Sequence, residues 1–209
     1  AASLDENTVT ALRTALATHS VLSVPEQDLD PAALERFSAQ VGAFGHDPYV
    51  APMDGFEHVI EVIREARETA PIFGSLWHSD WSFQATPPSA TVLFAAEVPP
   101  VGGDTVFADA YRAFESLSPT MQALLAQLNG VHTAAPAYGP KGLFARDDAS
   151  RSMRIIVSPE AEQMEVHPLV RRHPLSGRRA LYLNHVYTIG IEGMRADESK
   201  TLLDFLFRH

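Results

Sequence analysis

The chain contains no cysteine. This absence excludes a disulfide framework, a thiolate metal site and a cysteine nucleophile. Basic residues are also few, because 16 lysines and arginines stand against 26 aspartates and glutamates and leave a net charge of −10 at pH 7. An acidic chain without a block of lysine and arginine argues against nucleic acid or an anionic membrane surface as the main partner. A small organic anion stays compatible with it, since such a ligand needs only one or two local cations.

Long apolar runs are missing too. No stretch approaches the roughly 20 apolar residues of a membrane span. The N-terminal sequence AASLDENTVT lacks the basic start and apolar run of a signal peptide. We therefore predict a cytoplasmic protein without a membrane partner, and a homo-oligomer is one option for its assembly. A chain of 209 residues that is 45% apolar can build a sizeable core, which predicts a single domain over residues 1–209.

Helix signals are clear at both ends of the chain. Residues 7–19 and 196–209 carry apolar side chains at helical spacing. Asp30 before Pro31, and Ser118 before Pro119, combine a capping side chain with proline at the first helical position. Two more helices are therefore expected after these caps, one ending near residues 42–45 and one ending at Gly130.

Strand-like runs occupy most of the remaining sequence, whereas residues 137–153 look like a polar loop. The runs are rich in β-branched and aromatic residues and are bounded by turn residues. We expect a mostly β chain with flanking helices, and the predicted strands cover residues 19–25, 58–65, 89–100, 103–110, 131–134 and 178–194.

The sequence LWHSDWSF, residues 76–83, places His78 and Asp80 among apolar neighbours. On a strand, residues two apart point to the same face, about 6.6 Å apart at Cα, so both side chains can reach one ion with Trp77 on the opposite side. Open iron sites use two histidines and one carboxylate. From the pair alone, an ordinary ion pair between Asp80 and His78, or a zinc or manganese site of a hydrolase, stays open.

The wider sequence resembles the taurine dioxygenase (TauD/TfdA) family of non-haem iron(II), 2-oxoglutarate-dependent dioxygenases. The resemblance rests on W-H-x-D followed by S-F, on T-P-P, on G-G-D-T and on the sequence AYRAFESLSP, all between residues 77 and 119. Residues 166–209, beginning VHPLVRRHPLSG, resemble the second half of the same family. The similarity therefore covers about residue 41 to the end.

The resemblance implies a double-stranded β-helix (jelly roll) and an oxidoreductase that uses Fe(II), 2-oxoglutarate and O2. Its substrate would be a small organic anion such as a sulfonate, a sulfate ester or an aryloxyalkanoate. Gly74 stands where taurine-acting members carry a side chain that reaches the substrate, which puts taurine itself in doubt. By position, His78 and Asp80 match the first two iron ligands, Thr105 matches the 2-oxoglutarate contact, and the substrate contacts match His46, Tyr49, Asn184 and Tyr187.

Two parts of the family's site have no counterpart between residues 1 and 209: a distal histidine ligand and an arginine for the far carboxylate of 2-oxoglutarate. We expect both beyond residue 209, together with the last strands of the jelly roll. Neither His132 nor His185 has a spacing that recommends it as the third ligand. The arginines at 171, 172, 178 and 179 flank a turn and are expected to face solvent. A binding protein that has lost its catalytic activity is the remaining alternative.

Overall fold

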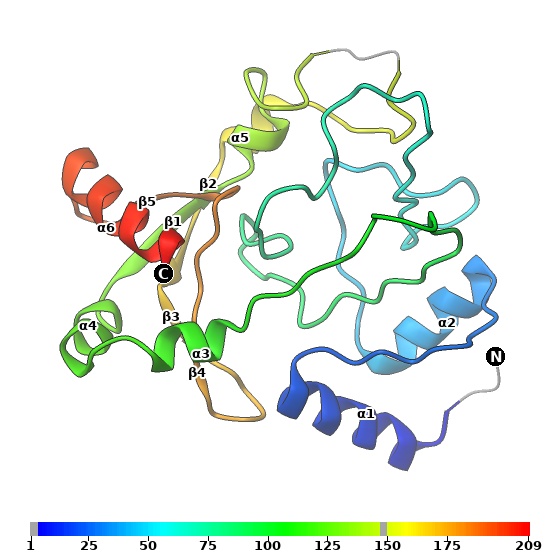
Figure 1. The fold of residues 1–209 in the computed structure, drawn as a ribbon, viewed down its shortest axis with the longest axis horizontal. Coiled ribbons are helices and arrows are strands. Elements are labelled where there is room, and N and C mark those ends of the chain that lie inside the picture. The colour runs from blue at the N-terminus through cyan, green and yellow to red at the C-terminus, as the bar shows by residue number, and fades with distance from the viewer. Residues whose placement is uncertain (1–3, 147–149) are drawn as a thin grey trace.

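The structure is a computed structural model that describes residues 4–146 and 150–209. Sheets and short helices gather on one side of the molecule, and a long irregular segment lies beside the first two helices on the other (Figure 1). The helices in chain order are α1 (Glu6–His19), α2 (Pro31–Val41), α3 (Ala110–Glu115), α4 (Pro119–Leu125), α5 (Ala135–Tyr138), the 3₁₀ helix η1 (Pro159–Glu162) and α6 (Ala196–Arg208).

Capping side chains start the helices where the sequence predicts. Asp30 Oδ1 accepts from Ala33 N at 2.6 Å at the start of α2, and Ser118 Oγ accepts from Met121 N at 3.3 Å at the start of α4. These bonds satisfy donors that the first helical turn leaves without partners. The predicted end of α4 at Gly130 is wrong, because the helix stops at Leu125 and Gly130 lies in the following strand.

Two small antiparallel sheets form the ordered β structure. β1 (Asn129–Thr133) lies between β2 (Met164–Pro168) and β5 (Thr188–Ile191), and β3 (Val170–Arg172) pairs with β4 (Arg179–Leu181). Helix α6 packs beside β5 with its apolar face inward. One core cluster there joins Phe114, Leu117, Leu125, Leu169, Leu181, Ile191, Leu203 and Leu206.

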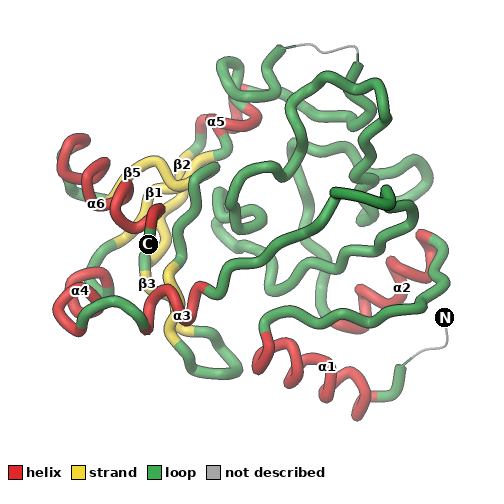
Figure 2. Tube along the Cα trace, in the orientation of Figure 1, coloured by secondary structure: helices red, strands yellow, loops and turns green. Residues whose placement is uncertain are grey.

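Several predicted strands do not form in the described part of the chain. Residues 19–25, 58–65, 89–100 and 103–110 have no strand assignment, and the run 178–194 divides into β4 and β5 around a turn. A strand needs a partner for its backbone groups, and the described backbone hydrogen bonds include none within residues 85–108. Figure 2 shows this segment as loop, and Leu93 and Val106 are 65% and 67% exposed.

A second core cluster supports the segment that contains His78. It gathers aromatic rings from three distant parts of the chain, and antiparallel contacts between residues 49–51 and 154–156 close it on one side. The loop predicted over 137–153 is confirmed apart from Ala137 and Tyr138, which end α5, and residues 147–149, which lie outside the described residues. The buried aromatic members are Tyr49, Phe83, Tyr138, Phe144 and Tyr187.

Candidate functional site

His78 and Asp80 contact each other through one atom of each side chain. His78 Nε2 lies 3.2 Å from Asp80 Oδ1, and the side chains are 28% and 42% exposed. Residues 77–79 are not helical, and a turn begins at Asp80. The prediction that the two side chains converge from a non-helical segment is therefore confirmed. Trp77, expected on the opposite side, is 52% exposed.

The other two polar atoms of the pair are held from behind. His78 Nδ1 lies 2.8 Å from the Leu76 carbonyl, which can only accept, so Nδ1 carries the proton and donates. Thr91 Oγ1 donates to Asp80 Oδ2 at 2.6 Å. Bonds of this kind fix the ring tautomer and the carboxylate orientation in metal sites. They leave Nε2 and Oδ1 facing one another.

This arrangement fits a divalent metal ion. Two ligand atoms at adjacent positions of an octahedral ion, each about 2.1 Å from it, lie ~3 Å apart. The observed 3.2 Å between Nε2 and Oδ1 matches this separation. Without a metal, the hydrogen bond between the two raises the pKa of His78 and lowers the pKa of Asp80, in each case against the effect of burial.

Trp81 anchors the segment directly after Asp80. Its backbone is in the left-handed region at φ 49°, which is unfavourable for a bulky residue. The indole Nε1 donates to Asp47 Oδ2 at 2.8 Å, and Asp47 Oδ1 accepts from the backbone of Tyr49 and Val50. Burial raises the pKa of Asp47 despite these bonds. Asp47 thus ties the loop around residue 47 to the segment of His78 and Asp80.

Tyr187 lies edge-on to His78, with 6.5 Å between the ring centroids. Its ring also meets Phe83 at 4.8 Å, and only 6% of the residue is exposed. Burial raises the pKa of Tyr187 to about 12, so its hydroxyl stays protonated at neutral pH. An aromatic wall therefore flanks the imidazole of His78, as the sequence predicts for Tyr187.

A buried hydrogen-bond network fixes the same segment to the sheet. Asn184 Nδ2 donates to Ser82 Oγ at 2.9 Å, so the Ser82 hydroxyl is free to donate to His132 Nδ1 at 3.1 Å. Asn184 Oδ1 accepts from the backbone N–H groups of Val186 and Tyr187. His132 is 0% exposed, and burial lowers its pKa to about 4, so it is neutral. Ser82 connects this network to Asp80, two residues earlier.

We expect Ser82→Ala to lower the free energy of unfolding by about 1–3 kcal/mol, because the substitution leaves buried groups of Asn184 and His132 without a partner. Urea denaturation measures the effect. Ser75→Ala is the matched control in the same segment, since Ser75 is exposed, and it should change stability by less than about 0.5 kcal/mol. Equal stability of the two variants would show that the network does not hold the segment.

The remaining predicted site residues lie in different surroundings. Thr105 is exposed and has no described hydrogen bond to the pair. His46 is exposed and its carbonyl accepts from Gln84. Tyr49 is 7% exposed and stacks on Tyr138 in the core. Asn184 is buried within the network, where both ends of its amide have protein partners.

No third ligand joins the pair within residues 4–146 and 150–209, where no group of three histidine, aspartate or glutamate side chains could hold a metal. His132 bonds to Ser82, and His185 stacks on Phe207. Neither replaces the missing ligand, as expected. The arginines near the turn have other contacts: Arg171 over Tyr182, Arg172 with Gly177, Arg178 with Glu115 and Arg179 over Phe114.

Sequence reasoning missed Thr91, Asp47 and Ser82 as parts of the site. Thr91 lies 11 residues after Asp80, and Asp47 lies 34 residues before Trp81. The only local signal was the T in the run SATVLF and the D in HDPY, and neither specifies a partner. The described helices also include none that is long and apolar enough to cross a membrane.

Comparison with known proteins gives one family. The family model described as "Taurine catabolism dioxygenase TauD, TfdA family" matches residues 1–209. An alpha-ketoglutarate-dependent sulfate ester dioxygenase of Pseudomonas putida is 31% identical over 208 residues, which cover 99% of this chain and 67% of that protein. An alpha-ketoglutarate-dependent sulfonate dioxygenase of Saccharomyces cerevisiae is 34% identical over 149 residues, or 68% of this chain and 34% of that protein.

A solved structure agrees with these matches. A taurine dioxygenase from Burkholderia xenovorans aligns with a TM-score of 0.76 and 30% sequence identity, covering 100% of this chain and 65% of that one. The chain therefore spans between about a third and two thirds of the length of these three relatives.

Proposed function

This chain belongs to the taurine catabolism dioxygenase (TauD/TfdA) family, and we propose that it forms the metal-binding part of an Fe(II)- and 2-oxoglutarate-dependent dioxygenase. The contact between His78 Nε2 and Asp80 Oδ1 at 3.2 Å carries the proposal. Both atoms face one another while Leu76 and Thr91 hold the other side of each group. An ion pair that served only stability would not need this support, because exposed pairs contribute little.

His78 and Asp80 would hold the metal through these two atoms. When bound, Fe(II) with O2 couples the loss of CO2 from 2-oxoglutarate, which gives succinate, to hydroxylation of the substrate. The chain's own residues keep the ligands in place and the surroundings dry. Thr91 holds the Asp80 carboxylate, and the ring of Tyr187 shields one side of the His78 imidazole. Such fixed ligands cost no reorganisation when the metal binds.

We assign the other residues by the family resemblance. Tyr187 is the substrate-side aromatic residue, which its place beside His78 supports. Thr105 would contact 2-oxoglutarate, and His46 and Tyr49 the substrate, with Asn184 acting through the turn that places Tyr187. The jelly roll, the third ligand and the arginine for 2-oxoglutarate remain part of the proposal, with the last two supplied from outside these 209 residues.

The proposed substrate is a small organic anion: a sulfonate, a sulfate ester or an aryloxyalkanoate. Gly74 supports a substrate other than taurine. It has φ 70°, and a Cβ placed there would lie 3.7 Å from His78 Cε1. A larger residue at this position would be strained in the left-handed region, so the space beside His78 stays open for the substrate.

Oxygen uptake tests the proposal. The full-length protein, loaded with Fe(II) under anaerobic conditions, is mixed with 2-oxoglutarate, O2 and each member of a panel of the three substrate classes. We expect oxygen consumption that requires 2-oxoglutarate, produces one succinate per O2 and accelerates with one class. The metal-free protein is the control.

Two other outcomes separate the alternatives. Hydrolysis of a panel compound with zinc or manganese, in the absence of O2 and 2-oxoglutarate, would make the protein a hydrolase. Binding of a panel compound by the iron-loaded protein without any turnover would make it a binding protein of the same fold. Either result would overturn the dioxygenase proposal.

A further inference from the structure

A second pocket lies away from the His78–Asp80 pair. It is a cavity of about 70 Å³ between residues 62–73 and residues 151–155. A cavity needs roughly 10–15 Å³ to hold one water, so this one can take a small organic group. Its wall is mostly apolar and includes Ile63, Ile72, Phe73, Met153 and Ile155. Three charged side chains reach it, namely those of Arg64, Glu68 and Arg151.

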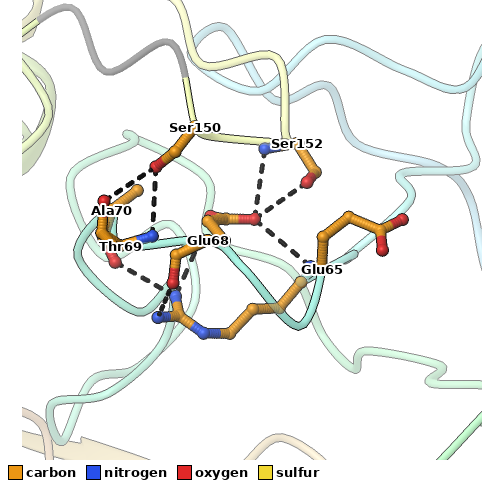
Figure 3. Close-up of polar contacts among 7 residues, drawn as sticks. Glu65, Glu68, Thr69, Ala70, Ser150 and Ser152 are labelled. Atoms are coloured by element: carbon orange, nitrogen blue, oxygen red, sulfur yellow. Dashed lines mark hydrogen bonds and ion pairs between the residues drawn. The ribbon is translucent and has the colours of Figure 1, made fainter.

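Glu68 and Arg64 already have partners. Glu68 Oε2 accepts from the backbone and the hydroxyl of Ser152 and from Glu65 N, as Figure 3 shows. The Arg64 guanidinium donates to the carbonyls of Ala70 and Glu68 and lies 3.8 Å from Glu68 Oε1. These contacts neutralise Glu68 with one cation and fold the loop of residues 64–70 around it.

Arg151 differs, because most of its donors are unused. Its Nε and Nη2 atoms are buried and have no hydrogen-bond partner, while Nη1 makes one 3.5 Å contact with the Phe144 carbonyl. The guanidinium carbon lies 5.1 Å from the centre of the Phe144 ring, which holds the side chain from one face. Nε and Nη2 form the side edge of the guanidinium, where a carboxylate or sulfonate binds through two parallel hydrogen bonds.

The charges in the cavity do not balance. Two arginines face one glutamate, so one positive charge is left in an apolar surrounding. A buried charge without a partner is costly, and a native protein rarely keeps one without a ligand, water or ion. A ligand that completes this cavity has one negative oxyanion group for the Arg151 edge and a short apolar stem for the wall.

We propose that this cavity is a binding site for a short amphiphilic anion, a carboxylate or sulfonate on an alkyl stem, held by the Nε–Nη2 edge of Arg151. The site is built on residues other than His78 and Asp80 and does not depend on the dioxygenase proposal. It needs no metal, so its occupancy can be measured on the metal-free protein.

Thermal unfolding of the metal-free protein with added sodium butyrate tests the site, at constant ionic strength. We expect the unfolding midpoint to rise by ~3–6 °C at ten times the dissociation constant. Butan-1-ol and butylammonium chloride have the same stem without the anion and should cause no such rise. A rise with butan-1-ol equal to that with butyrate, or none with butyrate at all, would overturn the proposal and leave the guanidinium to water.

Substitutions of Arg151 locate the effect. Arg151→Met should remove the butyrate response while the ligand-free protein is as stable as wild type or more so, because an unpaired buried charge is gone. Arg151→Lys, which keeps the charge and loses the fork, should weaken the response about tenfold. Arg154→Met is the control, since Arg154 is exposed and pairs with Asp54; it should respond as wild type does. An unchanged response in both Arg151 variants would refute the assignment.

A carboxylate of the chain itself is the other source of an anion. Asp147 and Asp148, which lie outside the described residues, precede Arg151 in the sequence. The double variant Asp147→Asn/Asp148→Asn should show the same butyrate response as wild type. A response that appears only in this double variant would show that the chain fills its own site, and the free-ligand proposal would be wrong.

Discussion

Asp80→Ala is expected to abolish 2-oxoglutarate-dependent oxygen consumption, with a loss of at least ~10³-fold. The carboxylate offers the charge that a divalent metal needs, and its Oδ1 is half of the pair with His78. Asp80→Glu should fail as well, because the extra methylene moves the oxygen away from the position that Thr91 now fixes. An oxygen electrode measures the loss, with succinate determined in parallel.

Stability should change little in the same variant, since the Asp80 side chain is 42% exposed. Asp54→Ala is the matched control. Asp54 is also paired, in this case with Arg154, and its side chain is 92% exposed. It should keep wild-type oxygen consumption. A variant without Asp80 that consumes oxygen at a near wild-type rate would remove Asp80 from the site.

Gly45→Ala is expected to destabilise the protein by about 1–3 kcal/mol and to lower activity with it. A Cβ at residue 45 would lie 2.4 Å from Trp81 Cζ3, which no relaxed contact allows. The Trp81 ring cannot yield freely, because its indole is bonded to Asp47 and its backbone is left-handed. A shift of Trp81 would move Asp80, its neighbour in the chain. Urea denaturation and oxygen uptake measure the two effects.

Gly42→Ala provides the comparison for this variant. A Cβ at residue 42 would meet only Ser89 Oγ at 3.8 Å, an ordinary contact, and the φ of Gly42 is −172°. This substitution should leave stability within about 0.5 kcal/mol of wild type. Equal effects of the two substitutions would show that the close approach of Gly45 and Trp81 is not a constraint.

Local signals in the sequence predicted the local parts of the structure. The caps at Asp30 and Ser118 start their helices as expected, because a capping bond needs only residues three apart. The meeting of His78 and Asp80 followed from the two-residue period of extended chain. The family was also identified from motifs within one segment, and the match to the family model confirms it.

The parts that depend on distant residues could not be predicted. Thr105 and Phe107 lie in a run that favours a strand by composition, yet a strand forms only when another segment supplies its hydrogen bonds. The link from Ser82 to Asn184 spans 102 residues, and the link from Ser82 to His132 spans 50. A single serine or asparagine gives no local sign of such a partner.

Anaerobic titration of the full-length protein with Fe(II), followed by calorimetry, tests the central claim most directly. We expect one binding site in the wild type. His78→Ala and Asp80→Ala should each lower the affinity by at least ~100-fold, and Thr91→Val, which removes the hydroxyl behind Asp80, by about 10–100-fold. If wild type, His78→Ala and Asp80→Ala bind Fe(II) with the same affinity, the pair does not hold the metal and the proposed function fails.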